Sequence, residues 1–422
     1  MKEDLLHYVW RLQRFDHSDL ITTEGQSINI QHVGILNQHA GPDFTDARIQ
    51  IGDTLWAGNV EMHLKASDWT THQHQSDKAY ENVILHVVLN EDEKINRQDG
   101  SRIPCLELKK RIPNKLSKIY KKLLHNEQWI PCQHHFYKVG QMTKVLWLDR
   151  LLVERLERKT MTIENLLKEN TYNWEMTLYQ VLARNFGVKV NAEPFGRLAR
   201  SLPLAILGKH KSNLFQIEAL FFGQAGLLED DFEDDYPNRL KREYHFLQKK
   251  YQLHPIEKMS WRFLRMRPAN FPTIRIAQFA QLIFQSVHLF SKMLAAQNVK
   301  EIEQMFELRL SNYWQTHYIF DKASPKRNKS LGKNTIHLFI INTIAPFLFL
   351  YGKSKANEDY QDKAFQLLEA LHPEKNNIIT KWKELGITPE SAYQSQALLQ
   401  LKNEYCAKKK CLECSIGNAI LR

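Results

Sequence analysis

Two acidic residues and a histidine near the N-terminus have types and spacing suited to metal-assisted hydrolysis. Asp43 precedes the apolar-alternating segment 44–51, and Glu61 and His63 lie two residues apart in the segment 54–65. Because side chains alternate along a strand, Glu61, His63 and Lys65 share one strand face. The pattern predicts a catalytic group composed of Asp43, Glu61, His63 and Lys65.

A tight turn at Gly52 and Asp53 is expected to bring Asp43 close to this face. Simple antiparallel pairing across the turn places Asp43 opposite Met62, one residue away from both Glu61 and His63. Strict pairing would leave Asp43 on the face of Met62. A shared site therefore requires a β-bulge or another departure from pairing near Pro42.

The carboxylates of Asp43 and Glu61 predict a Mg²⁺ or Mn²⁺ site. Two neighbouring carboxylates resist ionising together unless a cation compensates them, and Mg²⁺ prefers carboxylate oxygens and water. Such an ion acidifies an attacking water and offsets charge that develops on a phosphodiester. The ordinary pKa of histidine, about 6.5, suits a general base, so His63 is expected to activate the water with Lys65 in support.

The sequence Pro42-Asp43 followed by Glu61-Met62-His63 resembles the signature of the PD-(D/E)xK nuclease superfamily. There an Asp begins one strand of a hairpin, and a Glu, any residue and a Lys lie on the next. The resemblance covers roughly residues 1–110. It implies Asp43, Glu61 and the main-chain carbonyl of Met62 as metal ligands, whereas His63 stands where the superfamily usually has lysine.

The whole chain also resembles an uncharacterised bacterial family that shares the GPDF, GNVE-x-H and RPxNFPTIR stretches, a resemblance that implies no activity. An alternative interpretation of the hairpin is structural. In it, Asp43 closes a turn, Glu61 pairs with an arginine such as Arg48, and His63 is a half-buried strand residue. A degenerate nuclease core that binds nucleic acid without cutting belongs to this alternative.

A second polar cluster follows the hairpin and consists of Asp68, His72, His74 and Asp77. The His72-x-His74 spacing could bind Zn²⁺ or help to orient a phosphate, although two histidines alone do not complete a zinc site. The functional interpretation is support for the first site. The alternative is the solvated start of a helix.

A formal charge of +11 and a pI near 9.2 favour an anionic partner, because clustered lysine and arginine attract phosphates. The segment 261–275 interleaves arginines with aromatic residues, which suits phosphate pairing and base stacking. Its predicted nucleic-acid-binding residues are Arg262, Arg265, Arg267 and Arg275. The alternative is an arginine-rich helix end whose aliphatic stems pack on the core.

Cys406, Cys411 and Cys414 crowd into one short C-terminal segment, which in a reducing compartment favours metal binding over disulfides. Cys132 is the expected fourth ligand, with His134 and His135 as substitutes in a zinc site. The arrangement resembles the iron–sulfur staple of some helicase-nuclease proteins and CRISPR-associated nucleases. Its spacing departs from the usual staple, so an iron–sulfur cluster and Zn²⁺ both stay open. Cys105 is expected in a core strand.

The elements that would position these residues predict an α+β protein. A helix at 2–15 precedes two hairpins, a polar connection at 69–80, a strand at 83–89 and a short strand at 105–108. Helical periodicity follows, with long helices expected at 147–167, 174–186, 236–251, 274–294 and 299–314. The expected domains are a mixed-sheet PD-(D/E)xK-like core at 1–125, an all-helical domain at 126–400 and a cysteine-rich segment at 401–422.

The N-terminal residues do not read as a signal peptide, and the most apolar window, 336–351, is shorter than the roughly 20 residues that span a bilayer. It contains Asn342 and Pro346, so we expect a buried helix with a kink or a break. A cytoplasmic protein without a membrane partner is predicted. The expected function is a metal-dependent nuclease acting on DNA or RNA, and the alternative is a noncatalytic nucleic-acid-binding or scaffold protein.

Overall fold

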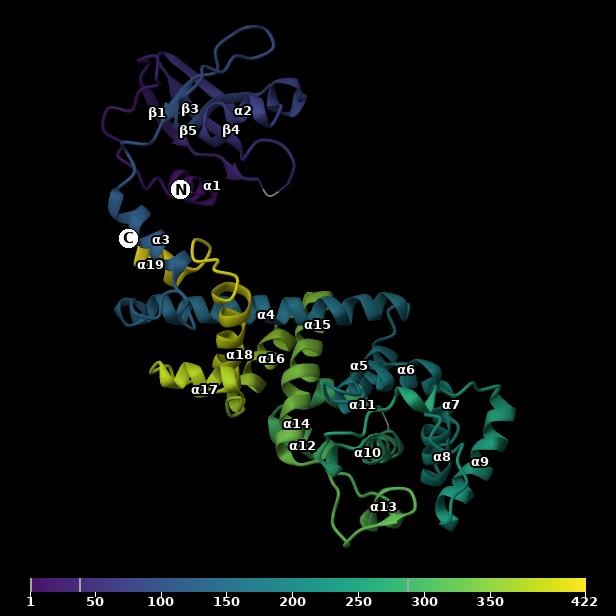
Figure 1. Cartoon of the computed structure of the whole chain (residues 1–422). Coiled ribbons are helices and arrows are strands. Elements are labelled where there is room, and N and C mark those ends of the chain that lie inside the picture. Colours follow the sequence, from purple (N-terminus) through teal and green to yellow (C-terminus); the bar gives the residue numbers. More distant parts are fainter. Residues whose placement is uncertain (1, 38, 287) are drawn as a thin grey trace. The chain divides into compact units, whose positions relative to one another are not determined.

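The computed structural model describes residues 2–37, 39–286 and 288–422, and the chain divides into two compact units (Figure 1). Unit 1 comprises Met1–Trp147 and Leu401–Arg422, and unit 2 comprises Leu148–Gln400. The C-terminal segment therefore belongs to the same unit as the N-terminal sheet. The first division falls at Trp147, which is 22 residues after the predicted boundary at residue 125.

Unit 1 is built around a mixed sheet of six strands with the order β1-β3-β4-β5-β6, and β2 pairs with β3. β4 runs antiparallel to β3 and parallel to β5, which in turn runs parallel to β6. This arrangement confirms the predicted α+β class. The elements are α1 (Glu3–Arg11), β1 (Ile28–His32), β2 (Ile35–Leu36), β3 (Phe44–Ile51), β4 (Thr54–Lys65), β5 (Val83–Asn90) and β6 (Cys105–Glu107).

The connection between the parallel strands β4 and β5 carries the short helix α2 (Asp68–Thr71) and two 3₁₀ turns, His74–Ser76 and Lys78–Tyr80. Trp69 of α2 is buried in a cluster that includes Val83, Val88 and Cys105. Cys105 thus lies in a core strand, as predicted. Because Trp69 fixes this connection to the sheet, the polar residues that flank it are held near β4.

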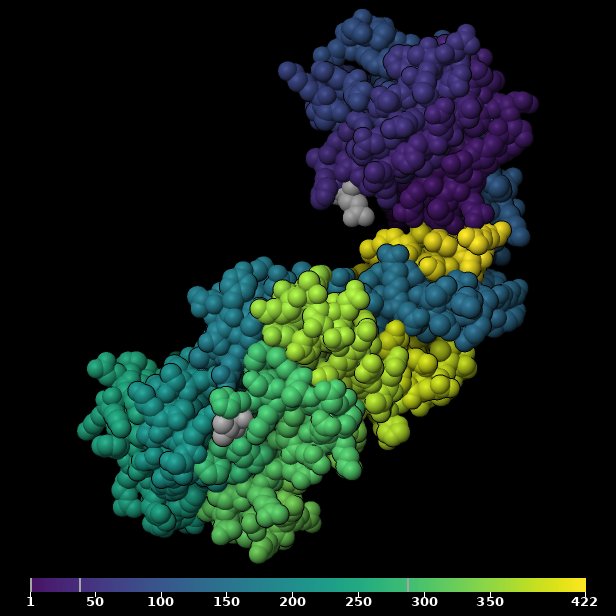
Figure 2. Space-filling model, turned by 180° about the vertical axis from the view of Figure 1, so that it is seen from behind, coloured from purple at the N-terminus to yellow at the C-terminus, as the bar shows by residue number. Residues whose placement is uncertain are grey.

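The remaining elements of unit 1 join its two stretches of chain. They are α3 (Asn114–His125), the 3₁₀ turn Phe136–Lys138, the start of α4 (Gln141–Glu169), the π-helical turn Leu401–Cys406 and α19 (Ser415–Leu421). α19 contacts both α3 and the turn Phe136–Lys138. Figure 2 shows the C-terminal residues in yellow against blue residues of this earlier segment.

Unit 2 is mostly helical, and asparagine side chains cap the N-termini of five of its helices: Asn173, Asn213, Asn298, Asn357 and Asn376. The helices are α5 (Trp174–Phe186), α6 (Ala192–Ser201), α7 (Leu204–Gly208), α8 (Leu214–Gln224), α9 (Asp235–Tyr251), α10 (Pro272–Gln285), α11 (Leu289–Ala295), α12 (Val299–Met305), α13 (Asn312–Thr316), α14 (Lys333–Phe339), α15 (Ala345–Lys355), α16 (Glu358–Ala370), α17 (Asn377–Glu384) and α18 (Ala392–Gln400).

Three helical predictions for unit 2 require correction. The domain is not all-helical, because β7 (His317–Ile319) and β8 (Lys322–Ala323) form a small hairpin. The helix expected at 274–294 is divided into α10 and α11, since Ser286 is extended and His288 is left-handed, while residue 287 lies outside the described residues. The helix expected at 299–314 ends at Met305, and α13 starts only at Asn312.

The apolar segment 336–351 lies in a continuous helical stretch, Lys333–Lys355, with a π-helical turn at Ile340–Ile344. The turn directly precedes Pro346, whose ring and missing N–H disturb regular α-helical bonding. The stretch is long and apolar enough to cross a membrane, and 72% of its most apolar window is buried inside the protein. The predicted break in a buried helix is confirmed as this π-helical turn.

A β-bulge in β3 sets the register on which the polar residues of the sheet depend. From Ile51–Thr54 to Ala47–Gly58 the β3–β4 pairing is regular, but Phe44 then pairs with Val60. Without the shift, Phe44 would face Glu61. The bulge therefore moves Asp43 from a position opposite Met62 to the position opposite Glu61. A bulge was expected near Pro42, and it lies at Thr45 and Asp46 instead.

Asp46 adopts a left-handed backbone with φ of 58° and is exposed, so its substitutions test the bulge. We expect Asp46→Val to lower the free energy of unfolding by about 1–2 kcal/mol, because a β-branched residue is strained there. Asp46→Gly should leave it unchanged or raise it slightly. Denaturant unfolding measures both, and Arg48→Val, at an exposed regular position of β3, is the control. Equal losses in the two valine variants would contradict this account.

Candidate functional site

Asp43 and Glu61 lie side by side at the start of β3 and the middle of β4, where the bulge brings them together. The Asp43 N–H donates to Glu61 Oε2 at 3.0 Å, and the Met62 N–H donates to Asp43 Oδ2 at 3.0 Å. These reciprocal bonds fix both carboxyl groups relative to the backbone. The predicted pairing of the two acidic residues is therefore present in the fold.

Glu61 is only 4% exposed, which makes its negative charge costly. Burial, followed by the charge of Asp43, raises the pKa of Glu61 to about 9. The carboxyl group is thus held in a place where its anion lacks compensation from a cationic side chain: Arg48, the alternative partner considered for it, is exposed on β3. A bound cation would supply that compensation.

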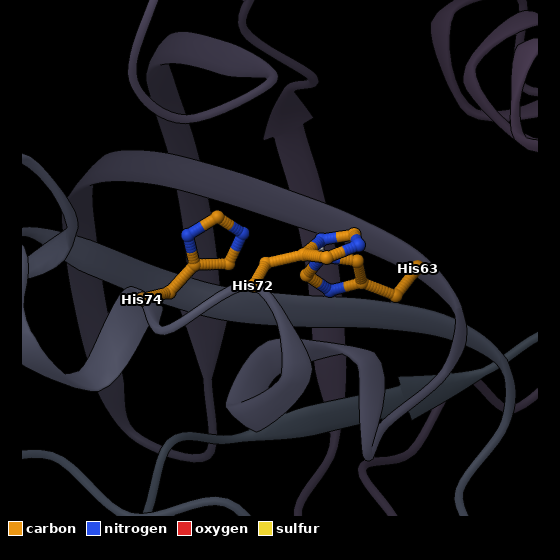
Figure 3. A group of neighbouring side chains, drawn as sticks. All are labelled: His63, His72 and His74. Carbon is orange, nitrogen blue, oxygen red and sulfur yellow. Dashed lines mark hydrogen bonds between the residues drawn. The ribbon is translucent and has the colours of Figure 1, made fainter.

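Three histidine rings lie together next to Glu61, and Figure 3 shows these rings, which belong to His63, His72 and His74. Their ligand atoms lie within 4.8 Å of one another. Glu61 Oε1 is 3.5 Å from His63 Nε2 and 3.4 Å from His74 Nε2, and His72 Nδ1 is 3.2 Å from His63 Nε2. Three imidazole nitrogens therefore lie together, and one carboxylate oxygen of Glu61 contacts two of the three rings.

His63 belongs to the sheet, whereas His72 and His74 come from the connection that Trp69 anchors. His86 on β5 lies opposite Glu61 in the parallel pairing, and its Nε2 is 2.9 Å from His63 Nδ1. This contact fixes the His63 ring and leaves Nε2 directed at Glu61 and His72. The result is an oriented imidazole in the arrangement typical of metal ligands.

Burial, then the neighbouring His74 and His72, lowers the pKa of His63 to about 3. A ring that stays neutral over the physiological range is a competent ligand, because metals bind the neutral imidazole. The same property makes His63 a weak base at neutral pH. The low pKa of His63 therefore favours a role as a metal ligand over the predicted role as a general base.

The donor set decides which ions fit. Mg²⁺ takes oxygen ligands almost exclusively, whereas Mn²⁺, Zn²⁺ and related ions accept imidazole together with carboxylate. Three nitrogens beside Glu61 fit a transition-metal ion better than the predicted Mg²⁺, and Mn²⁺ stays within the prediction. The Met62 carbonyl, a ligand implied by the resemblance, stays a prediction.

Helix α1 contributes residues that the sequence did not identify as part of the site. His7 Nε2 lies 3.1 Å from Asp43 Oδ2. Burial alone would lower the pKa of His7, but its contact with Asp43 outweighs that effect and raises it. Glu3, one turn earlier, is close enough to Asp43 and His7 for their charges to act on its own pKa. A helical pattern shows which residues share a face but not which sheet edge that face covers.

Lys65 does not join this group. It is exposed at the end of β4, and the pKa of Asp92 is lowered by the Ser67 backbone N–H and, to a lesser extent, by the Lys65 ammonium. The Lys65 ammonium is therefore close enough to Asp92 for their charges to interact. Asp68, from the second predicted cluster, accepts a hydrogen bond from the Lys65 N–H at 3.0 Å, and Asp77 caps the turn Lys78–Tyr80. Both acidic side chains therefore accept hydrogen bonds from backbone N–H groups.

The four predicted nucleic-acid-binding arginines lie in unit 2 and differ in accessibility. Arg262, Arg265 and Arg267 are exposed on an irregular segment. Arg275 is 5% exposed, and its guanidinium donates to Gln278 Oε1 at 3.0 Å and to Asn270 Oδ1 at 2.6 Å. Its inclusion requires correction, because these bonds give Arg275 a structural role inside α10.

Comparison with known proteins places the chain in a family whose activity is not described. Residues 3–377 match the family described as "Protein of unknown function (DUF2851)", and the chain belongs to this family. No curated protein and no solved structure matches the chain. The chemistry of the site must therefore be argued from its own residues.

Metal binding at the histidine site can be measured through stability. A ligand that binds only the folded state at 100 times its dissociation constant raises the free energy of unfolding by about 2.7 kcal/mol. We expect Mn²⁺ to raise the unfolding temperature more than Mg²⁺ does, and His72→Ala and His74→Ala to reduce that shift strongly. Mn²⁺ is the test ion because Zn²⁺ would also bind the thiolates of the C-terminal cysteines and so would not report on the histidine site alone.

The matched control is His245→Ala, which removes an exposed histidine of α9 in unit 2. It should retain the full Mn²⁺ shift. A shift that is equal for Mg²⁺ and Mn²⁺, or that persists in His72→Ala, would contradict the assignment of these ligands.

Proposed function

We propose that this member of the DUF2851 family is a metal-dependent hydrolase of phosphodiester bonds in nucleic acid. The observation that carries the proposal is the buried Glu61, flanked by Asp43 and by the imidazoles of His63 and His74, with His72 beside His63. A divalent ion in such a site acidifies water and offsets charge that develops on a phosphodiester. The resemblance to PD-(D/E)xK nucleases supports the same reaction class.

The residues of the chain divide into those that hold the ion and those that hold its ligands. Glu61, His63, His72 and His74 would bind it, and Asp43 lies beside them as the second carboxylate. His86 orients His63, and the Met62 N–H orients Asp43. His7, at 3.1 Å from Asp43, is placed to contact a phosphate oxygen or to carry a proton to a leaving group.

A basic pocket in unit 1 supports an anionic polymer as the substrate. The pocket has a volume of about 970 Å³ and includes His7 in its lining. Its charged lining residues are Lys2, Arg11, Lys408, Lys409 and Lys410 against Asp4 and Glu413, a net charge of +3 with histidines neutral. A cleft of this sign attracts phosphates toward His7 and thus toward Asp43.

The second candidate function is nucleic-acid binding without cleavage. The exposed Arg262, Arg265 and Arg267 favour it, because they lie in unit 2 and their phosphate contacts would not require the metal site. The two proposals differ in what they expect of Glu61. Only hydrolysis needs its carboxylate.

Cleavage assays with single- and double-stranded DNA and RNA test the hydrolase. With Mn²⁺ present, we expect Glu61→Gln and Asp43→Asn each to lower the rate on the order of 100-fold or more, since each removes a carboxylate that would help to hold the ion, and the ion offsets the developing phosphoryl charge. Asp53→Asn, at the exposed tip of the β3–β4 hairpin, is the control and should keep the rate. If no substrate is cut, the noncatalytic candidate stands. If Glu61→Gln cuts as fast as the wild type, cleavage does not come from this site and the hydrolase proposal fails.

Salt dependence of binding identifies the side chains that touch phosphate. Removing one such side chain should reduce the slope of log affinity against log salt by roughly 0.7–0.9. We expect this reduction for Lys408→Gln and Lys410→Gln, whose side chains are exposed in the basic pocket, and none for Lys355→Gln on α15.

The same measurement on Arg265→Ala and Arg267→Ala asks whether the unit 2 arginines contact the polymer as well. Two reduced slopes would place phosphates on both units. Unchanged affinity and slope in both arginine variants, with the fold intact, would assign that segment a structural role.

A further inference from the structure

Four of the five cysteines meet in unit 1, although the whole of unit 2 separates Cys132 from the other three in the sequence. Cys406 is close enough to Cys132, Cys411 and Cys414 for each of their charges to act on it. Cys132 is likewise influenced by Cys414 and Cys411. Cys132, Cys411 and Cys414 are each at most 8% exposed.

The backbone around these cysteines is tightly packed. Gly417 lies so close to the Cys411 carbonyl that a side chain at this position would meet it at 2.1 Å. α19, which starts directly after Cys414, contacts the turn Phe136–Lys138, and the N–H groups of His135 and Phe136 donate to the Cys132 carbonyl. The close approach of the yellow and blue segments in Figure 2 is this contact.

Burial is the largest influence on the Cys414 thiol and raises its pKa, while nearby N–H groups of Ile416, Gly417 and Trp147 act in the opposite direction. A metal ion deprotonates the thiols that it binds and compensates the thiolates that result. Four buried thiolates in one packed segment would therefore need a metal centre as their main counter-charge.

We propose that Cys132, Cys406, Cys411 and Cys414 hold a metal centre through four thiolates, and that its occupant is an iron–sulfur cluster. A cation that binds all four sulfurs supplies the counter-charge. Among the described residues, no three of these sulfurs lie within 4.8 Å of one another. Thiolates on one zinc ion would be about 3.8 Å apart, given Zn–S bonds of about 2.3 Å. A cluster spreads its ligands over several irons and so suits the wider spacing.

The centre would also shape the basic pocket, a consequence that rests on the proposed function. Lys408, Lys409 and Lys410 occupy the loop between the ligands Cys406 and Cys411 and line the pocket that includes His7. Lys409 has a left-handed backbone with φ of 52°, which a lysine adopts only when its surroundings enforce it. Ligands at both ends of the loop would enforce that conformation.

Metal analysis of the full-length wild-type protein, purified without oxygen, tests the centre directly. Stoichiometric iron and acid-labile sulfide with broad visible absorption support the proposal. Stoichiometric zinc in a colourless protein, at a site that cysteine substitution abolishes, would overturn the cluster while retaining the four-thiolate site. A protein with neither iron nor zinc would overturn both parts.

Variants assign the ligands without relying on one that fails to fold. Cys411→Ser and Cys132→Ser should each lose most of the bound iron and lower the unfolding temperature, since binding free energy at such a site contributes to folding. Cys105→Ser alters a buried cysteine of β6 and should keep the iron. Circular dichroism verifies the fold. Full iron in folded Cys132→Ser would exclude Cys132 as a ligand.

Two further measurements separate this proposal from the hydrolase. Glu61→Gln should keep the iron and the visible absorption, because Glu61 belongs to the histidine site. Cys411→Ser should keep the Mn²⁺-induced stabilisation but weaken nucleic-acid binding with a smaller salt slope. Loss of iron in Glu61→Gln would contradict two separate centres. An unchanged salt slope in iron-free, folded Cys411→Ser would contradict the effect on the lysine loop.

Discussion

The burial of Glu61 beside Asp43 is the constraint that organises unit 1. Two carboxyl groups bridged by backbone N–H groups cannot both carry charge in a sheet interior without compensation. His7 can carry a positive charge beside Asp43, because that contact raises its pKa, whereas the imidazoles beside Glu61 belong to His63 and His74, whose pKa values are lowered. An ion bound by those imidazoles would compensate Glu61, and its binding would then be coupled to folding.

The mixed topology explains how five histidines reach one pair of carboxyl groups. An antiparallel hairpin alone would present only residues of β3 and β4. The parallel strand β5 adds His86 beside Glu61, and its long connection from β4 returns across the sheet with His72 and His74. Helix α1 adds His7 from the side of β4. The bulge at Asp46 adds the second carboxyl group, because it places Asp43 opposite Glu61.

Much of this site could be predicted from the sequence, and the misses have physical reasons. Glu61 and His63 follow from strand alternation, and the need for a bulge followed from turn geometry, but its position depends on a left-handed Asp46 that no local pattern indicates. His86 is the one ionisable residue in the apolar run VILHVVLN, a signal that could have been used. The contact of His7 with Asp43 depends on where α1 packs on the sheet, and the structural role of Arg275 depends on its burial. The spacing of residues in the sequence indicates neither of them. Cys132 was predicted as a partner of three distant cysteines; the structure places all four in unit 1, where α19, which follows Cys414, contacts the turn after Cys132, and their binding of one centre stays a prediction.

The two proposed centres would use different donor atoms within one unit. Imidazole with carboxylate accepts Mn²⁺ as well as Zn²⁺, whereas four thiolates prefer iron–sulfur clusters or zinc. Mn²⁺ would therefore distinguish the histidine site from the cysteine site. The proposed thiolate centre lies near the points where the chain leaves for unit 2 and returns from it, so metal–sulfur bonds there would fix the two ends of the insertion Leu148–Gln400 in addition to packing. The returning segment carries Lys408, Lys409 and Lys410 into the pocket that includes His7. The cysteine centre would therefore determine where a phosphate is held, and the histidine site would determine where it is attacked.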